Sequence, residues 1–140
     1  MNTINKQVTL ASRPVGFPKE SDFQLVESPI PTPAPGQFLV RSLYLSVDPY
    51  IRPRIGGGKS YARAVEIGEV IVGGAVGQVV ESSHTGFAKG TIVVGDFGWQ
   101  QFALSDGAGV RKVDPTLAPI STALSVLGIT GLTAYFGLID

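Results

Sequence analysis

Residues 43–52 read Leu-Tyr-Leu-Ser-Val-Asp-Pro-Tyr-Ile-Arg, and within this stretch an apolar run meets a sharp turn. The apolar part completes an alternating run over residues 38–46, which predicts a β-strand. Asp48 and Pro49 then end the strand, because proline fixes φ and an aspartate side chain readily hydrogen-bonds the backbone of a turn. We therefore expect the Asp48 carboxylate to brace a loop at this point.

Further runs of alternating or β-branched residues flank this stretch on both sides, with turn signals between them. They are Gln7–Leu10, Phe23–Glu27, Glu69–Glu81, Thr91–Gly95, Trp99–Leu104 and Val110–Val113. The 140 residues include 18 glycines and 10 prolines, so the chain turns often. Short strands at this spacing with little helix predict a mainly β fold, a small closed or partly open barrel.

The helical signal is confined to the end of the chain, over Ser121–Leu127 and Thr130–Ile139. Both segments are apolar on every face, a pattern typical of a buried helix. The uncharged run from Pro115 to Ile139 is long enough to span a bilayer, but its prolines, glycines and hydroxyl residues lower the hydropathy. We expect a buried connection without a membrane anchor, and the lack of a helix stop signal suggests that it leads into further protein.

Charge and cysteine usage exclude several classes of function. Eleven basic and eleven acidic residues cancel, which removes the electrostatic case for a nucleic-acid partner. The chain contains no cysteine, so disulfides and thiolate-bound metals are excluded, and a reducing compartment, the cytoplasm, is expected. The first residues lack the apolar stretch of a secretory signal.

Two glycine-rich segments look like nucleotide-binding motifs but lack the required context. The run Gly56-Gly57-Gly58-Lys59-Ser60 ends like a P-loop, yet the position of its first glycine is Pro53. The run from Gly73 to Gly77 lies before Asp96 as in a dinucleotide fingerprint, but its spacing is wrong and a strand follows instead of a helix. We expect these glycines to permit a mobile loop and a bulge or close strand packing, respectively.

Isolated polar groups offer little further chemistry. His84 is the single histidine and lies in a turn, where solvation is the usual state. Four cations, Arg52, Arg54, Lys59 and Arg63, have no acid between them. They could attract an anionic cofactor or substrate, or form a solvated loop. Composition and spacing alone indicate a β-rich domain and do not identify a reaction.

The stretch Leu43–Arg52 closely resembles the signature of one branch of the medium-chain dehydrogenase/reductase superfamily. This branch contains prostaglandin and leukotriene reductases, plant alkenal double-bond reductases and bacterial curcumin-reductase-like enzymes. Two later stretches, Val72–Ser82 and Leu127–Leu138, resemble the same branch, so the likeness covers nearly the whole chain. The early residues Leu10–Pro14 and the later Gly98-Trp99-Gln100 are in keeping with it.

The resemblance implies a GroES-like, partly open β-barrel with short helices over residues 1–125. Residues 126–140 would then begin the connection to a Rossmann domain that this chain lacks. The implied reaction transfers a hydride from NADPH to the β-carbon of an α,β-unsaturated carbonyl compound, an enone or enal, after which the α-carbon is protonated. NADP(H) would be bound mainly by the second domain, so this chain alone is expected to be inactive, and the full enzyme is expected to be a homodimer.

The resemblance also predicts that no metal takes part. Zinc alcohol dehydrogenases of the superfamily carry a catalytic cysteine three residues before the aspartate that matches Asp48, and that position here is Leu45. Their Gly-His-Glu element falls near Val72-Gly73-Gly74, where glycine replaces the histidine ligand. Hydrogen-bond donors would therefore stabilise the oxyanion.

Four residues are predicted site residues by resemblance. Tyr50 would face the substrate and donate a proton or hydrogen bond, although a purely pocket-shaping ring is the alternative. Ile51 would contact substrate beside it. Thr133 and Ile129 would contact the nicotinamide side of the cofactor, although the Thr133 hydroxyl could instead bond back to its own helix. Trp99 is expected to serve in barrel packing rather than as a substrate platform.

Two other functions stay open. A zinc-independent quinone reductase would share the fold and cofactor, and a stand-alone GroES-like barrel would be a binding or assembly module. We further expect the apolar tail to dock on its own barrel, stay disordered or pair with a second copy, and we favour pairing. The natural substrate is not readable from these residues.

Overall fold

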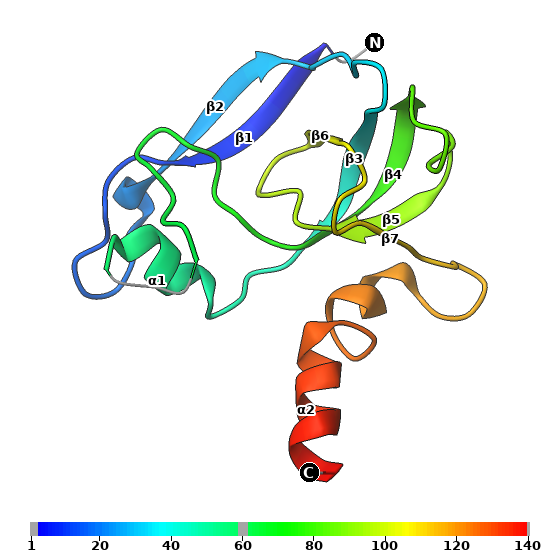
Figure 1. Cartoon of the computed structure of the whole chain (residues 1–140). Helices are drawn as coiled ribbons and strands as arrows, with labels where there is room; N and C mark the ends of the chain where they lie inside the picture. The colour runs from blue at the N-terminus through cyan, green and yellow to red at the C-terminus, as the bar shows by residue number, and fades with distance from the viewer. Residues whose placement is uncertain (1–2, 59–61, 140) are drawn as a thin grey trace.

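The computed structural model describes residues 3–58 and 62–139, whose strands form two antiparallel sheets that are not closed into one barrel (Figure 1). The strands are β1 (Ile4–Leu10), β2 (Phe23–Pro29), β3 (Phe38–Leu45), β4 (Ala75–Ser82), β5 (Ile92–Gly95), β6 (Phe102–Ser105) and β7 (Arg111–Lys112). The helices are α1 (Ile51–Gly56) and α2 (Ile129–Ile139), with short 3₁₀ turns η1 (Glu20–Asp22) and η2 (Ile120–Leu124). The predicted mainly β, partly open fold with short helices is confirmed.

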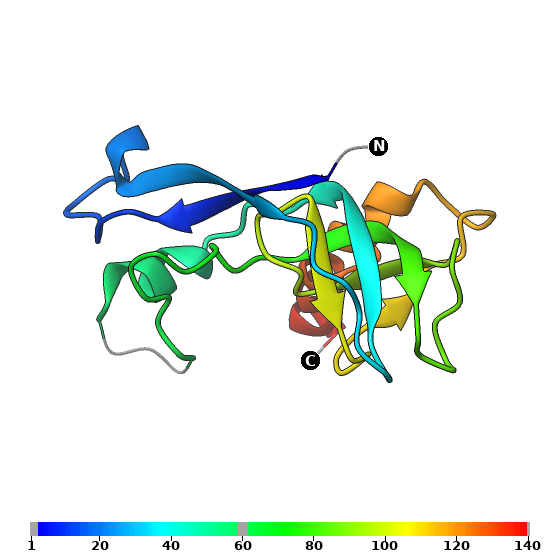
Figure 2. The same ribbon diagram turned by 90° about the horizontal axis from the view of Figure 1, so that it is seen from above.

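Strands β1 and β2 form a two-stranded ribbon, and α1 lies at the same end of the molecule as the far end of that ribbon (Figures 1 and 2). Between these elements lies one of two apolar cores, in which every member is at most 4% exposed. Its members are Leu10, Ile51, Ile55, Val65 and Ile71. This core fixes α1 to the ribbon and so positions the residues directly before α1.

The second sheet has the strand order β6-β3-β4-β5-β7. Its core consists of Phe38, Val40, Ala75, Val79, Val93, Phe97 and Ala103. The register of β3 against β4 shifts between Ser42 and Tyr44, opposite Gly77. A Cβ at Gly77 would collide with the Val40 side chain and the Arg41 carbonyl, so the predicted close packing of strands at this glycine is confirmed.

The ribbon is joined to the larger sheet by backbone hydrogen bonds of Lys6 and Val8 with the segment before β6, and by side-chain amides. Asn5, which is 1% exposed, donates to the Phe102 carbonyl and accepts from the Phe102 N–H, both at 2.9 Å. The Gln7 amide donates to the Gln100 side-chain oxygen at 2.7 Å, and Asn5 donates to the same oxygen at 3.3 Å. The joint therefore satisfies its buried polar groups without an ionised side chain.

Two predicted segments differ from the structure. The run Glu69–Glu81 is not one strand, because residues 71–74 belong to no strand and β4 begins only at Ala75. Before β4 the chain pairs with β1, where the Ile71 N–H donates to the Val8 carbonyl at 2.9 Å. Helix α1 was not predicted, because Pro53 and the following glycines signal a loop. Pro53 lies in the first turn of the helix, where a backbone N–H has no intrahelical partner to lose.

The C-terminal helix α2 leads away from the strands (Figure 1). None of its described residues is buried, although the all-round apolar pattern indicated a buried helix. Its large side chains are between 55% and 86% exposed. Within the part of the chain that the structure describes, no helix is long and apolar enough to cross a membrane.

Candidate functional site around Tyr50

Tyr50 directly precedes α1, and the predicted loop brace lies just before it. The Ser46 hydroxyl donates to the Asp48 carboxylate at 2.6 Å, which confirms the expected role of Asp48. The Ile51 N–H donates to the Asp48 carbonyl at 3.1 Å, so the chain turns into the helix here. The Tyr50 ring is half-buried and packs against the core between α1 and the ribbon.

The surroundings of Tyr50 keep its phenol neutral. Partial burial raises the pKa of Tyr50 above its usual value of 10, and the carboxylates of Asp96 and Asp48 raise it further. A backbone hydrogen bond from Gly74 and the positive charge of Arg54 act in the opposite direction. The net direction is upward, so the hydroxyl retains its proton and can donate it, or a hydrogen bond, to a developing negative charge.

The Gly73–Gly74 segment lies next to the phenol, and its backbone is held on several sides. The Ser46 N–H donates to the Gly74 carbonyl at 2.8 Å, and the Gly98 N–H donates to the Gly73 carbonyl at 3.0 Å. The Gly73 N–H donates to a carboxylate oxygen of Asp96 at 2.9 Å. Every one of these bonds uses the backbone of the segment.

Trp99 explains why position 73 holds glycine. Its indole N–H donates to the Ser46 carbonyl at 3.2 Å, and its ring stacks on Phe23 with centroids 6.1 Å apart. A Cβ at Gly73 would lie 2.8 Å from the indole nitrogen. Trp99 thus packs the ribbon against the loop of Ser46, which confirms the predicted packing role.

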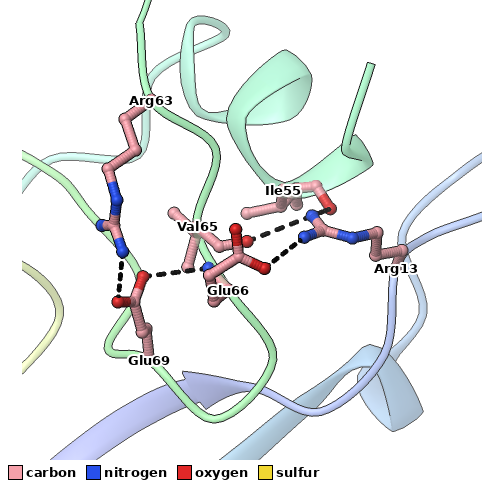
Figure 3. Close-up of polar contacts among 6 residues, drawn as sticks. All are labelled: Arg13, Ile55, Arg63, Val65, Glu66 and Glu69. Atoms are coloured by element: carbon pink, nitrogen blue, oxygen red, sulfur yellow. Dashed lines mark hydrogen bonds and ion pairs between the residues drawn. The ribbon is translucent and has the colours of Figure 1, made fainter.

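Three arginines hold the loops around α1. Arg13 donates to the Ile55 carbonyl at 3.4 Å, to the Val65 carbonyl at 3.1 Å and to the Glu66 carboxylate at 2.9 Å (Figure 3). Arg52 donates to the carbonyls of Pro14 and Gly16, at 3.3 and 2.7 Å. Arg63 pairs with Glu69 at 2.6 Å, and Glu69 also accepts the Glu66 N–H at 2.9 Å.

The arginines of the predicted cationic cluster, Arg52, Arg54 and Arg63, therefore all make contacts within the chain. They form neither an open site for an anion nor a loop that contacts only solvent. Arg54 donates to the Arg63 carbonyl at 3.1 Å and lies 4.0 Å from Asp96. Lys59, the fourth predicted member, lies outside the described residues, as does Ser60 of the P-loop-like run. The described part of that run follows a helix instead of a strand, so it has no P-loop context.

The structure separates the predicted site residues into two groups. Ile51 is 4% exposed and packs inside the core, so it supports Tyr50 and offers little surface to a substrate. Ile129 is 68% exposed, and the Thr133 hydroxyl donates to the Ile129 carbonyl at 2.6 Å, the helix back-bond that was the alternative reading. Both lie on α2, apart from α1 in Figures 1 and 2. Cofactor contact by these two residues stays a prediction.

His84 is half-buried rather than solvated. Its ring contacts Phe38 and Phe87, and its Nδ1 accepts the Gly86 N–H at 2.8 Å. Within residues 3–58 and 62–139, no three acidic or histidine side chains gather closely enough to hold a metal ion. Asp96 and Arg13 were not predicted as members of the site, because their partners lie far away in the sequence.

The open two-sheet fold and the Tyr50 loop define the class, a GroES-like domain of the medium-chain dehydrogenase/reductase superfamily. Residues 6–113 match the family described as N-terminal domain of oxidoreductase. The chain belongs to this family.

Individual relatives agree with this assignment. The chain is 44% identical to an NADP-dependent oxidoreductase, YfmJ, of Bacillus subtilis, over 100% of the chain and 41% of that protein. It is 45% identical to the NADPH-dependent curcumin reductase of Escherichia coli, over 97% of the chain and 39% of the relative. It superposes on CurA of Vibrio vulnificus in complex with NADPH with a TM-score of 0.90 and 49% identity, over 96% of the chain and 40% of CurA.

The resemblance to the curcumin-reductase-like branch is thereby confirmed. The chain spans about two fifths of the length of these relatives.

Proposed function

We propose that this chain is the substrate-side domain of an NADP(H)-dependent oxidoreductase that reduces the C=C bond of α,β-unsaturated carbonyl compounds. The observation that carries the proposal is its 45% identity, over nearly the whole chain, to a curcumin reductase. Curcumin is itself an α,β-unsaturated ketone. The solved CurA complex contains NADPH, which supports the choice of cofactor.

The proposed division of the chain places the barrel domain in residues 1–125 and the start of an interdomain connection in residues 126–140. Two observations support it. The short turn η2 packs against β4 and β5, whereas α2 beyond it buries no residue. The apolar surface of α2 would then meet a nucleotide-binding domain, and we propose a homodimer for the complete enzyme.

In this proposal bound NADPH supplies the hydride, and the residues of this chain act on the substrate. The glycine runs at 56–58 and 73–77 do not have the shape of a phosphate cradle, so the cofactor phosphates would be bound outside them. Tyr50 would hold its proton beside the substrate carbonyl and donate a hydrogen bond as negative charge develops on the oxygen. Leu45 offers no lone pair to a metal, consistent with a reaction that relies on hydrogen-bond donors.

A domain exchange tests this function. The 140 residues replace the matching N-terminal part of the Escherichia coli curcumin reductase. We expect the chimera to oxidise NADPH in the presence of an enone, and chelators should leave the rate unchanged. The isolated chain should show no turnover.

Binding of NADPH by the chimera, measured separately by fluorescence, establishes that its nucleotide-binding part has folded, and circular dichroism of the isolated 140-residue chain establishes that the exchanged domain folds. A chimera that binds NADPH but turns over neither enones nor enals would contradict the proposal. Faster reduction of quinones than of enones would favour the quinone-reductase alternative. Loss of activity with a chelator, restored by zinc, would contradict the metal-free mechanism.

A further inference from the structure

We propose that Asp96 is a positioning residue for Tyr50, because its carboxylate links α1 to the Gly73–Gly74 segment beside the phenol. The catalytic meaning of this link rests on the proposed function. The link itself is a property of the folded chain.

The first half of the link is the contact with the Gly73–Gly74 segment. One oxygen of Asp96 accepts the N–H of the buried Gly73 at 2.9 Å, while the Gly98 N–H donates to the Gly73 carbonyl at 3.0 Å. The segment 96–98 thus binds both backbone groups of one residue. A carboxylate is a stronger acceptor than a neutral oxygen, so this bond adds a charged attachment to the neutral backbone ones.

The second half of the link is the contact with α1. The other oxygen of Asp96 lies 4.0 Å from the Arg54 guanidinium, whose side chain is only 17% exposed. Arg54 is four residues after Tyr50, so the two side chains lie on the same side of the helical turn. Arg54 is itself held by its 3.1 Å bond to the Arg63 carbonyl. Asp96 therefore connects two segments that are distant in sequence.

The Tyr50 phenol lies near both segments, because the Gly74 backbone and the charges of Asp96, Asp48 and Arg54 all act on its pKa. Asp48 is bound to the Ser46 hydroxyl at 2.6 Å and stays on the loop before Tyr50. Asp96 is thus the acid that both holds the Gly73–Gly74 segment and places a negative charge near the hydroxyl.

Two substitutions separate the hydrogen bond of Asp96 to Gly73 from the effect of its negative charge on the phenol. Asp96→Asn keeps an oxygen that can accept the Gly73 N–H but removes the charge, whereas Asp96→Ala removes both. Asp106→Asn is the matched control, because Asp106 also accepts a backbone N–H, that of Ala108 at 2.9 Å, in a turn elsewhere in the chain. The chain is labelled with ¹³C-tyrosine, and Tyr50→Phe assigns the Tyr50 signal.

The expected results concern the phenol and the Gly73–Gly74 segment separately. In Asp96→Asn the pKa of Tyr50 should fall, because a raising charge is removed. In Asp96→Ala the Gly73 amide should exchange roughly tenfold faster or more, since a hydrogen bond to a charged group is lost. The nuclear Overhauser contact between the Tyr50 ring and the Gly74 amide should also weaken.

Other results would overturn the proposal. If the Tyr50 pKa in Asp96→Asn matches that in Asp106→Asn, Asp96 does not act on the phenol. If Asp96→Ala leaves the ring-to-Gly74 contact intact, Asp96 does not position Tyr50, even when Gly73 exchanges faster. No substrate or cofactor enters these measurements, so an inactive chimera would refute the proposed function and leave this link standing.

Discussion

At the residue scale, Tyr50 combines an apolar support with a polar hydroxyl. Its ring rests on the core that contains Ile51, while its hydroxyl faces the Gly74 backbone and the charge of Asp96. A phenol whose pKa is raised remains a hydrogen-bond donor throughout the physiological range of pH. Such a group is suited to stabilise an oxyanion and unsuited to act as a base.

Removing the hydroxyl should therefore affect rate more than structure. In the chimera, Tyr50→Phe is expected to slow enone reduction by about 10- to 100-fold, measured as NADPH oxidation at saturating substrate. Tyr44→Phe, at a half-exposed tyrosine of β3, is the control and should be neutral. If Tyr50→Phe matches the unmodified chimera and only Tyr50→Ala is impaired, the ring serves as a wall and donates nothing.

Gly73 tests the packing next to Tyr50. Gly73→Ala would bring a methyl group within 2.8 Å of the Trp99 indole nitrogen and 3.3 Å of the Ser46 carbonyl. We expect a loss of about 1–3 kcal/mol in the free energy of unfolding, measured in urea by the fluorescence of the single tryptophan. Gly58→Ala, where a Cβ would meet nothing within 4 Å, is the control. Equal stability of both variants would show that the indole can move aside.

At the scale of elements, α1 is too short to be stable alone and depends on contacts with other segments. Gly57 ends it in the left-handed conformation with φ of 72°. Arg13 then binds the Ile55 carbonyl at its last turn and the Val65 carbonyl in the loop that follows. The helix is thus stabilised by an arginine from the segment that follows β1.

Replacing Arg13 with alanine should destabilise α1. Arg13→Ala is expected to lower the free energy of unfolding by about 1–2 kcal/mol, because two carbonyls lose a charged donor. Glu66→Gln should have a much smaller effect, since Glu66 is 60% exposed and surface ion pairs contribute at most about 1 kcal/mol. Urea unfolding of both variants measures the difference. A larger effect for Glu66→Gln would assign the stabilisation to the ion pair.

The strands were predictable from sequence because alternation marks half-buried strands directly, as in the run that became β3. Asp48 was predictable because its hydroxyl partner is only two residues away. Helix α1 was not, since Pro53 and three glycines favour a loop and the contacts that stabilise the helix, such as those of Arg13 and the apolar core, come from distant parts of the sequence. Asp96 was missed for the same reason, because its partner Gly73 is 23 residues away.

At the scale of the whole molecule, α2 leaves a large apolar surface uncovered. Leu132, Tyr135, Phe136, Leu138 and Ile139 are all more than half exposed, and burying each would contribute about 1.5–3 kcal/mol. Helix α2 has no buried residue among those that the structure describes. Of the expected outcomes for this segment, pairing with a second copy is the one we predict for the chain alone.

Sedimentation tests this pairing. The 140-residue chain should show a concentration-dependent dimer, and a chain ending after Ser125 should remain a monomer. The truncated chain keeps both sheets and η2, so its circular dichroism controls for folding. A full chain that stays monomeric at high concentration would show that the glycines and hydroxyl residues of the segment keep its apolar surface in solution.

The amide hydrogen bonds between the β1–β2 ribbon and the larger sheet determine how the domain responds to pH and salt. Asn5, Gln7 and Gln100 carry no charge at any physiological pH, so neither acid nor salt weakens their bonds. The ion pair of Asp96 and Arg54 lies instead beside Tyr50, where salt can screen it because the Asp96 side chain is 58% exposed. Ionic strength can therefore change the electrostatic field at the phenol without weakening the hydrogen bonds of the three amide side chains.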